Sequence, residues 1–324
     1  MKNAFLVGVV ASALLAGHGQ AASQGMGKDA FNVARATVSL GPADWPVYVA
    51  NQEGFLAQEK LKVETSVISP SNIASSLIGG AIDIALIPAY QLVLSVQKGS
   101  DLVAVGQGLD PAPYFLMVPA SIKTFADLKG KTIAAATPGD VYTIVLKEVL
   151  QKGGLDPDKD VHFLYGNNSN QRMAALLNGA ISAALQLPPE TGMLREQGFH
   201  SLAFFPDYYK RLTLSLTAVR KDWAVKNADY LRAYMRAVAH ASAWLNDPKN
   251  EQEAIKVLMK DTNTNEKAAD EAYQVFVQQI GNYPNDACIQ PEGMKVLIAK
   301  LAEMGDVQGD PPVAKFIDQE WCPS

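Results

Sequence analysis

Residues suited to holding a small molecule gather in six short segments of this sequence, each of which follows a predicted strand. The segments are residues 41–46, 69–72, 88–90, 137–142, 166–170 and 186–190. They contain Trp and Tyr rings that can stack on a ligand, Ser, Thr, Asn and Gln side chains that can hydrogen-bond it, and the acids Asp44, Asp140 and Glu190. Open α/β sheets place their ligands at the carboxyl ends of strands, so these segments predict a binding site.

Several of these side chains also have a structural role open to them. Trp45 can pack a helix against a sheet as readily as it can stack on a ligand. Asp140 stands where an acid caps a helix, and Glu190 stands in the first turn of a predicted helix, where a negative charge is stabilising. About half of the tyrosines Tyr90, Tyr114, Tyr142 and Tyr165 are expected to be packing residues.

The motifs that signal an enzyme are absent from the sequence. It contains no HExxH, CxxC, Walker-type phosphate loop, GxSxG elbow or cluster of metal ligands. Gly106 and Gly108 lack the third glycine of a dinucleotide-binding loop. His162, His200 and His240 fall in predicted strands or helices and are interpreted as structural. We therefore expect no catalytic residues, no cofactor and no metal.

Strands and helices alternate through the first part of the chain, which is typical of α/β folds with mostly parallel sheets. The first block predicts strands at 33–40, 61–68, 82–87 and 102–105 and helices at 45–59, 71–79 and 90–97. The block 114–205 predicts strands near 131–136, 162–165, 181–185 and 201–205. A strand at 212–219 is followed by helices at 228–245, 251–259, 266–280 and 291–304, which we expect to form a helical cap on the first block.

One fragment of the first block recurs in the second. The helix-turn-strand LIGGAIDIAL, which begins at Leu77, is echoed by LLNGAISAAL, which begins at Leu176, a constant offset of 99 residues. Convergence on a helix, a glycine cap and a buried strand is the alternative explanation. We favour two α/β lobes of like topology. The first comprises residues 22–110 and 212–324, the second comprises residues 111–211, and crossings near 109–113 and 206–211 act as hinges.

Residues 1–21 are predicted to be a signal peptide. Lys2 precedes an apolar run, residues 4–16, that is too short to span a bilayer and ends in small residues. Gly19 and Ala21 fit the cleavage site, so we expect cleavage after Ala21, with Ala22 as the alternative. No Cys follows the run, so we expect a free periplasmic protein without a lipid anchor.

The net charge and the cysteines limit the kinds of partner and compartment that fit this sequence. Removing Lys2 changes the formal net charge from −5 to −6, since 27 basic residues then face 33 acidic ones. This mild acidity gives no basic patch for nucleic acid or for a membrane surface. The two cysteines of the chain, Cys288 and Cys322, are expected to form a disulfide in an oxidising compartment.

Three segments carry a family resemblance. They are NQEGFLAQEKLKVE from Asn51, SLIGGAIDIALIPA from Ser76 and SIKTFADLKGKTIAAATPGD from Ser121. With their ordered spacing, the chain resembles periplasmic ABC-transporter solute-binding proteins of the sulfonate, taurine, nitrate and thiamine-pyrimidine group, called NMT1/THI5-like. The resemblance implies a type II periplasmic binding protein fold, in which two α/β lobes close on a solute.

By position, the family's ligand-contacting loops fall on 44–45, 71–72, 89–90, 139–142 and 186–190. Together with the residue chemistry, this gives the candidate ligand-binding residues Asp44, Trp45, Ser71, Asn72, Ala89, Tyr90, Tyr114, Gly139, Asp140, Tyr142, Asn168, Gln186 and Glu190. The expected partners are a small-molecule solute and the transmembrane subunits of an ABC permease, with no nucleic acid, and the protein is expected to be a monomer.

The chain departs from sulfonate binders of this group where Pro138, Gly139 and Asp140 replace a small Gly-Ser stretch. An ionised Asp140 would oppose an anion at that helix start, so we favour a nitrogen heterocycle or amine, such as a pyrimidine or an aminosulfonate. Two other functions stay open at this point: a pyrimidine-precursor-synthesising enzyme on the same fold, and a solute-sensing subunit for a membrane receptor.

Overall fold

The computed structural model describes residues 32–38, 41–165 and 168–323. The predicted signal peptide therefore lies outside the described residues. In the described part of the chain, no helix combines the length and the hydropathy of a membrane-spanning segment.

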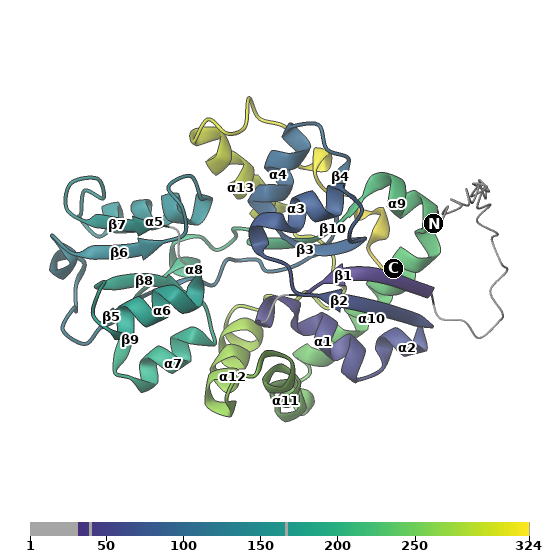
Figure 1. The fold of residues 1–324 in the computed structure, drawn as a ribbon, viewed down its shortest axis with the longest axis horizontal. Helices are drawn as coiled ribbons and strands as arrows, with labels where there is room; N and C mark the ends of the chain where they lie inside the picture. The colour runs from purple at the N-terminus through teal and green to yellow at the C-terminus, as the bar shows by residue number, and fades with distance from the viewer. Residues whose placement is uncertain (1–31, 39–40, 166–167, 324) are drawn as a thin grey trace, which may run out of the picture. The chain divides into compact units, whose positions relative to one another are not determined.

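The strands form two sheets of five strands each (Figure 1). Sheet A has the order β2-β1-β3-β10-β4, and its strands are β1 (Asn32–Thr37), β2 (Leu61–Ser66), β3 (Ile84–Pro88), β4 (Leu102–Gln107) and β10 (Ser215–Arg220). Sheet B has the order β7-β6-β8-β5-β9, and its strands are β5 (Phe115–Pro119), β6 (Thr132–Ala135), β7 (His162–Tyr165), β8 (Ala183–Gln186) and β9 (Phe199–Phe204).

The two sheets share one topology. In each, the first three strands are parallel, and the fourth runs antiparallel to its neighbours: β10 pairs antiparallel with β3 and β4, and β5 with β8 and β9. The start of β3 at Ile84 and the start of β8 at Ala183 are separated by the offset of 99 residues that the sequence repeat shows. The like topology predicted from that repeat is confirmed.

The local sequence pattern does not indicate every strand pairing of the two sheets. It did not predict β5, and it placed no antiparallel strand between β3 and β4. The two strands, β5 and β10, are each the first strand that the chain forms after it crosses from the other sheet. Each pairs with strands that are distant in sequence, and such pairing is not visible in a local pattern.

Helices cover both sheets. Around sheet A lie α1 (Trp45–Gln52), α2 (Phe55–Gln58), α3 (Pro70–Ile78), α4 (Ala89–Gln97), α9 (Lys221–Lys226), α10 (Ala228–Asn246), α11 (Glu251–Thr262), α12 (Glu266–Tyr273) and α13 (Pro291–Glu303). Around sheet B lie α5 (Val141–Lys152), α6 (Ser169–Leu177), α7 (Glu190–Glu196) and α8 (Phe205–Tyr208). The helix predicted at 45–59 is divided into α1 and α2 at Gly54, whose positive φ of 76° favours glycine.

The C-terminal helices pack against sheet A. Buried Leu231 and Met235 of α10 belong to one hydrophobic core with Ala34 and Ala36 of β1. The Tyr230 hydroxyl donates to the Lys62 carbonyl of β2 at 3.2 Å. Cys288 and Cys322 form a disulfide with a Cα–Cα distance of 5.2 Å, which confirms the predicted pairing and ties the C-terminal segment to the chain before α13.

Two segments connect the sheets, and they are hydrogen-bonded to each other. The Ala112 N–H donates to the Leu212 carbonyl at 2.9 Å, and the Leu214 N–H donates to the Leu109 carbonyl at 2.8 Å. Leu212 in turn donates its N–H to Asp110 Oδ1 at 2.9 Å. The two crossings therefore run side by side as a hydrogen-bonded pair.

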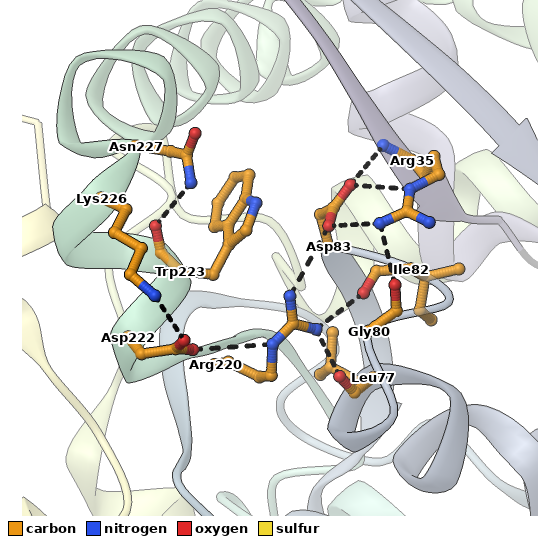
Figure 2. Close-up of polar contacts among 10 residues, drawn as sticks. All are labelled: Arg35, Leu77, Gly80, Ile82, Asp83, Arg220, Asp222, Trp223, Lys226 and Asn227. Atoms are coloured by element: carbon orange, nitrogen blue, oxygen red, sulfur yellow. Dashed lines mark hydrogen bonds and ion pairs between the residues drawn. The ribbon is translucent and has the colours of Figure 1, made fainter. Parts of the chain in front are cut away.

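An ion-pair network ties β1, β3 and β10 together at the start of β3 (Figure 2). Arg35 donates to both carboxylate oxygens of Asp83 at 2.9 to 3.1 Å, and Arg220 Nη2 lies 3.7 Å from Asp83 Oδ1. Arg220 also donates to the carbonyls of Ile82 and Leu77, and its Nε lies 3.6 Å from Asp222. The network fixes the position of antiparallel β10 beside β3.

Candidate functional site

A cavity of about 410 Å³ lies where segments from both sheets meet. Its sheet A side is formed by the end of β1, the chain after β2, the start of α3 and one residue of β3; its sheet B side is formed by the start of α6. The described lining residues are Thr37, Val38, Val67, Ile68, Pro70, Ile73, Leu86, Asn168, Ser169 and Asn170. Six of these ten side chains are apolar and none is charged.

Both helices that border the cavity begin there. Asn168 caps α6: its Oδ1 accepts from the Gln171 N–H at 2.9 Å, and Gln171 Oε1 accepts from the Asn168 N–H at 3.1 Å. No side chain caps α3, which begins at Pro70 after Ser69. The exposed Ser71 and Asn72 lie in this first turn of α3, and the Ser69 and Ser71 hydroxyls are 3.0 Å apart.

A buried polar cluster lies behind the first turn of α6. Ser169 Oγ donates to Gln186 Oε1 at 2.6 Å, and Gln186 Nε2 donates back to the Ser169 carbonyl at 3.2 Å. Arg172 is 7% exposed, and its Nε donates to the Leu185 carbonyl at 3.0 Å. This arrangement joins the start of α6 to the end of β8.

Two acids of the predicted site face Arg172. Burial raises the pKa of Asp140 to about 6, although the Thr143 and Tyr142 N–H groups and the charge of Arg172 act in the other direction. Burial also raises the pKa of Glu190, while the nearby Ser169 hydroxyl and the charge of Arg172 act in the other direction. Asp140 is the cap of α5, where its Oδ2 accepts from the Thr143 N–H at 3.2 Å. With both acids ionised, the Arg172 cluster has an excess of negative charge.

Three tyrosines of the predicted site touch one another. The rings of Tyr114 and Tyr142 have centroids 5.3 Å apart, and those of Tyr90 and Tyr142 are 6.4 Å apart in an edge-to-face arrangement. The Tyr142 hydroxyl lies within hydrogen-bond distance of the Thr213 carbonyl, at 2.9 Å, and of the Leu214 carbonyl, at 3.0 Å. Burial raises the pKa of all three phenols, so they stay neutral. Tyr90 lies in the first turn of α4 and Tyr142 in the first turn of α5, so the contact joins helices of the two sheets.

The structure places other predicted residues away from the cavity. Trp45 is fully buried, donates from Nε1 to the Ala254 carbonyl at 3.0 Å and meets Tyr273 edge to face at 6.0 Å. This is the packing role that the sequence left open for Trp45. Asp44 is 2% exposed and lies near Tyr283, and Ala89 is buried with its N–H donating to the Leu214 carbonyl. Gly139 is exposed beside Asp140, with open space where a side chain would stand.

Sequence reasoning missed Arg172 and six lining residues of the cavity, which are Thr37, Val38, Val67, Ile68, Ile73 and Leu86. The repeat contained a signal for one of them, because the offset of 99 aligns Arg172 with Ile73. Both are buried in the first turn of a helix, at 7% exposure each. One copy of the repeat has an apolar residue at this position and the other has a charged one. A charged side chain that is buried here serves a purpose other than hydrophobic packing.

The described residues contain one close group of acidic and sulfur side chains, Asp286 with Cys288 and Cys322. Since both sulfurs are used in the disulfide, the group does not offer thiolate ligands to a metal.

Comparison with known proteins places this chain and its fold in a family. A family model described as NMT1/THI5 like matches residues 42–251. YtlA of Bacillus subtilis (strain 168), which is named as a binding protein, is 22% identical over 283 residues, covering 85% of this chain and 84% of its own.

Two solved structures share the fold. The periplasmic nitrate-binding protein NrtA from Synechocystis PCC 6803 superposes with a TM-score of 0.75 at 16% identity, covering 90% of this chain and 87% of that one. The alkanesulfonate-binding protein SsuA from Xanthomonas axonopodis pv. citri, bound to MOPS, superposes with a TM-score of 0.70 at 20% identity, covering 89% and 98%. The predicted periplasmic binding protein fold is thus confirmed. Because the family model spans more than half of the sequence, the chain belongs to the NMT1/THI5-like family.

Proposed function

We propose that this protein is the solute-binding component of an ABC importer and captures a small organic solute between two closing lobes. The observation that carries the proposal is the cavity whose walls come from strand-end segments of both sheets. A solute in such a cavity contacts both lobes only when they approach each other, so it stabilises the closed form over the open one.

We propose the lobe boundaries given by the sequence, with residues 22–110 and 212–324 in one lobe and 111–211 in the other. Strand membership supports this division, since β1 to β4 and β10 form sheet A and β5 to β9 form sheet B. The paired crossings are then the hinge. Their mutual hydrogen bonds make the two segments bend together, which favours a single closing motion.

The cavity fits a solute with an apolar body and a hydrogen-bonding end. Val38, Val67, Ile68, Ile73 and Leu86 offer apolar surface, while Asn168 and Asn170 offer amide groups on the opposite wall. A sulfonate, a pyrimidine or an aromatic compound combines these two features. The acids Asp140 and Glu190, which both interact with Arg172 in the first turn of α6, suit a solute whose polar end carries an amine or a ring N–H.

We propose that capture involves no chemical reaction. Several polar side chains of the candidate site are engaged in holding the protein's own backbone and side chains: Asn168 caps α6, Asp140 caps α5 and Gln186 is bonded twice to Ser169. Groups held in this way shape a pocket. We further propose that the protein acts as a monomer in the periplasm and delivers its solute to the transmembrane subunits of an ABC permease.

A thermal-shift panel tests the proposal. Purified protein is melted with sulfonates, aminosulfonates, pyrimidines, aromatic acids and amines, and at least one class is expected to raise the melting temperature by several degrees. Asn170→Trp fills the cavity from an exposed position and is expected to abolish the shift, whereas Ala174→Trp, one turn further along α6 and also exposed, is expected to keep it. A shift that both variants retain would place binding elsewhere and overturn the assignment of the cavity.

A further inference from the structure

Helix α7 of the sheet B lobe is bonded to helix α12, which packs with the helices of sheet A. Thr191 Oγ1 donates to Glu271 Oε1 at 2.7 Å, and Arg195 forms an ion pair with the same carboxylate. Lys267 of α12 lies 3.4 Å from Glu196 of α7. Three polar interactions therefore connect the two lobes at a place outside the cavity, since none of these residues is among its described lining residues.

The contact is closely packed as well as charged. Thr191 and Leu194 are fully buried, and Gly192 faces α12. A Cβ atom on Gly192 would lie 2.7 Å from Glu271 Oε2 and 3.3 Å from the Cα of Ala268, so a side chain at this position would displace the Glu271 carboxylate and crowd the backbone of α12. The interface depends on glycine for its close approach.

Arg195 is oriented by its own lobe. Its guanidinium carbon lies 5.1 Å from the centroid of the Phe115 ring, and Phe115 is stacked on Phe204 with centroids 4.2 Å apart. A guanidinium that rests on an aromatic face is held in one orientation before it meets its partner. The Arg195 guanidinium is therefore already directed toward Glu271, whose side chain is 18% exposed.

The same short helix also reaches the solute site. Helix α7 begins at Glu190, which interacts with Ser169 and Arg172 at the start of α6. Ser169 lines the cavity. A solute that orders this wall therefore also orders the first turn of α7, and Thr191 is the next residue along the chain.

We propose that α7 and α12 form a clasp that holds the lobes closed around the solute, and that Glu271 is the positioning residue on which the clasp depends. This inference rests on the proposed function, because in it the contact between α7 and α12 controls the rate at which the solute is released. Loss of the Glu271 carboxylate is expected to speed the opening of the lobes about ten-fold, the scale typical of a charge pair that is hydrogen-bonded and partly buried.

Zero-length carbodiimide crosslinking tests the clasp without a known solute. The reagent joins a lysine to a carboxylate that touches it, so Lys267 and Glu196 are crosslinked only while α7 and α12 are in contact. The crosslinked peptide is quantified by mass spectrometry in wild type, Glu271→Ala and Gly192→Leu. We expect a clear yield in the wild type and a fall of five-fold or more in both variants. Glu271→Gln keeps an acceptor for Thr191 and is expected to give an intermediate yield.

The pair Lys256 and Glu253, 2.9 Å apart within α11, supplies the internal control, and its yield is expected to be equal in all samples. Absence of the Lys267–Glu196 crosslink from the wild type, or an unchanged yield in Glu271→Ala, would overturn the clasp. Either result would leave the proposed function standing if the thermal-shift panel finds a solute. A panel with no binder, beside a crosslink that depends on Glu271, would instead overturn the proposed function and its solute role while leaving the helix contact.

Discussion

Asp110 is a buried acid placed at the crossing between the two lobes. It is 1% exposed, and its Oδ1 accepts from the Leu212 N–H. Within the described residues its Oδ2 has no hydrogen-bond partner; Arg211 Nη1 is 3.9 Å away, and Oδ2 faces Gly293 in the first turn of α13. Burial raises the pKa of Asp110 to about 6 despite the Leu212 N–H and Arg211, and nearby Glu292 adds to the rise.

The titration of Asp110 predicts a pH-dependent stability. Its pKa is higher in the folded protein than its ordinary value of 3.8, so the folded state binds the proton more tightly. The resulting stabilisation is complete below about pH 4 and is lost as the pH rises through 6. Asp110→Asn keeps an acceptor for Leu212 and carries no charge. The variant is therefore expected to gain about 1 to 3 kcal/mol over wild type between pH 4 and pH 7.

Urea denaturation at several pH values measures this gain. The difference in unfolding free energy between variant and wild type is expected to grow from pH 4 to pH 6 and then to stay level. A difference that is constant across this range would contradict the raised pKa of Asp110.

Single residues also show where sequence reasoning stops. The sequence predicted that Asp140, Glu190 and several tyrosines gather near one another; the structure places the two acids near Arg172 and brings Tyr90 and Tyr114 against Tyr142, whereas Tyr165 stacks on Phe163. It could not decide between the two roles of Trp45, because stacking on a ligand and packing on Tyr273 require the same residue type. Only the course of α11, which brings the Ala254 carbonyl to the indole N–H, settles where that ring lies.

At the scale of elements, the Asp83 network fixes the antiparallel strand of sheet A. Asp83 receives three hydrogen bonds from Arg35 and lies beside Arg220, and its side chain is 10% exposed. The corresponding position in sheet B, by the offset of 99, is Ser182. Sheet B therefore holds the same topology without this charge network.

Asp83→Asn is expected to lower the free energy of unfolding by about 2 to 4 kcal/mol, because it removes the negative charge that Arg35 and the partly buried Arg220 share and leaves Asp222 as the acid beside Arg220. Ser182→Ala, at the equivalent position of sheet B, is expected to change it by less than about 0.5 kcal/mol. Guanidinium chloride denaturation of both variants measures the comparison. Equal effects at the two positions would show that the network adds nothing to sheet A.

The disulfide is a second feature at this scale. It closes a loop of 34 residues, for which the chain-entropy relation gives a stabilisation of about 3 to 4 kcal/mol. Replacing Cys288 and Cys322 together by Ser is expected to lower the unfolding free energy by that amount. Denaturation of the oxidised wild type and of the double variant measures the loss, and a change below about 1 kcal/mol would be inconsistent with it.

Some helices and strands could be predicted well from the sequence and others could not. The fragments around β3 and β8 were clear because helix, glycine turn and buried strand follow each other within ten residues of local pattern. Strands β5 and β10 differ, since each is paired on both sides with strands remote in sequence. The predicted strand at 212–219 begins instead at Ser215, after the crossing has formed its bonds with Leu109.

At the scale of the molecule, three features bear on the same motion, the closing of the two lobes. The crossings carry hydrogen bonds to each other, the cavity takes its walls from both sheets, and α7 bonds to α12. Tyr142 connects the two lobes beside the crossings, because its ring meets Tyr90 of α4 and its hydroxyl bonds to the Thr213 carbonyl of the second crossing. We therefore expect that filling the cavity, loosening the hinge and breaking the clasp all change the same property, the fraction of closed protein.

Native mass spectrometry of protein purified without refolding tests the central claim most directly. The wild type is expected to show a second mass, heavier by one small organic molecule, that disappears after denaturation and refolding. Asn170→Trp, which fills the cavity, is expected to lack it, and Ala174→Trp to retain it. A bound mass that persists unchanged in Asn170→Trp would show that the solute sits elsewhere and would contradict the account.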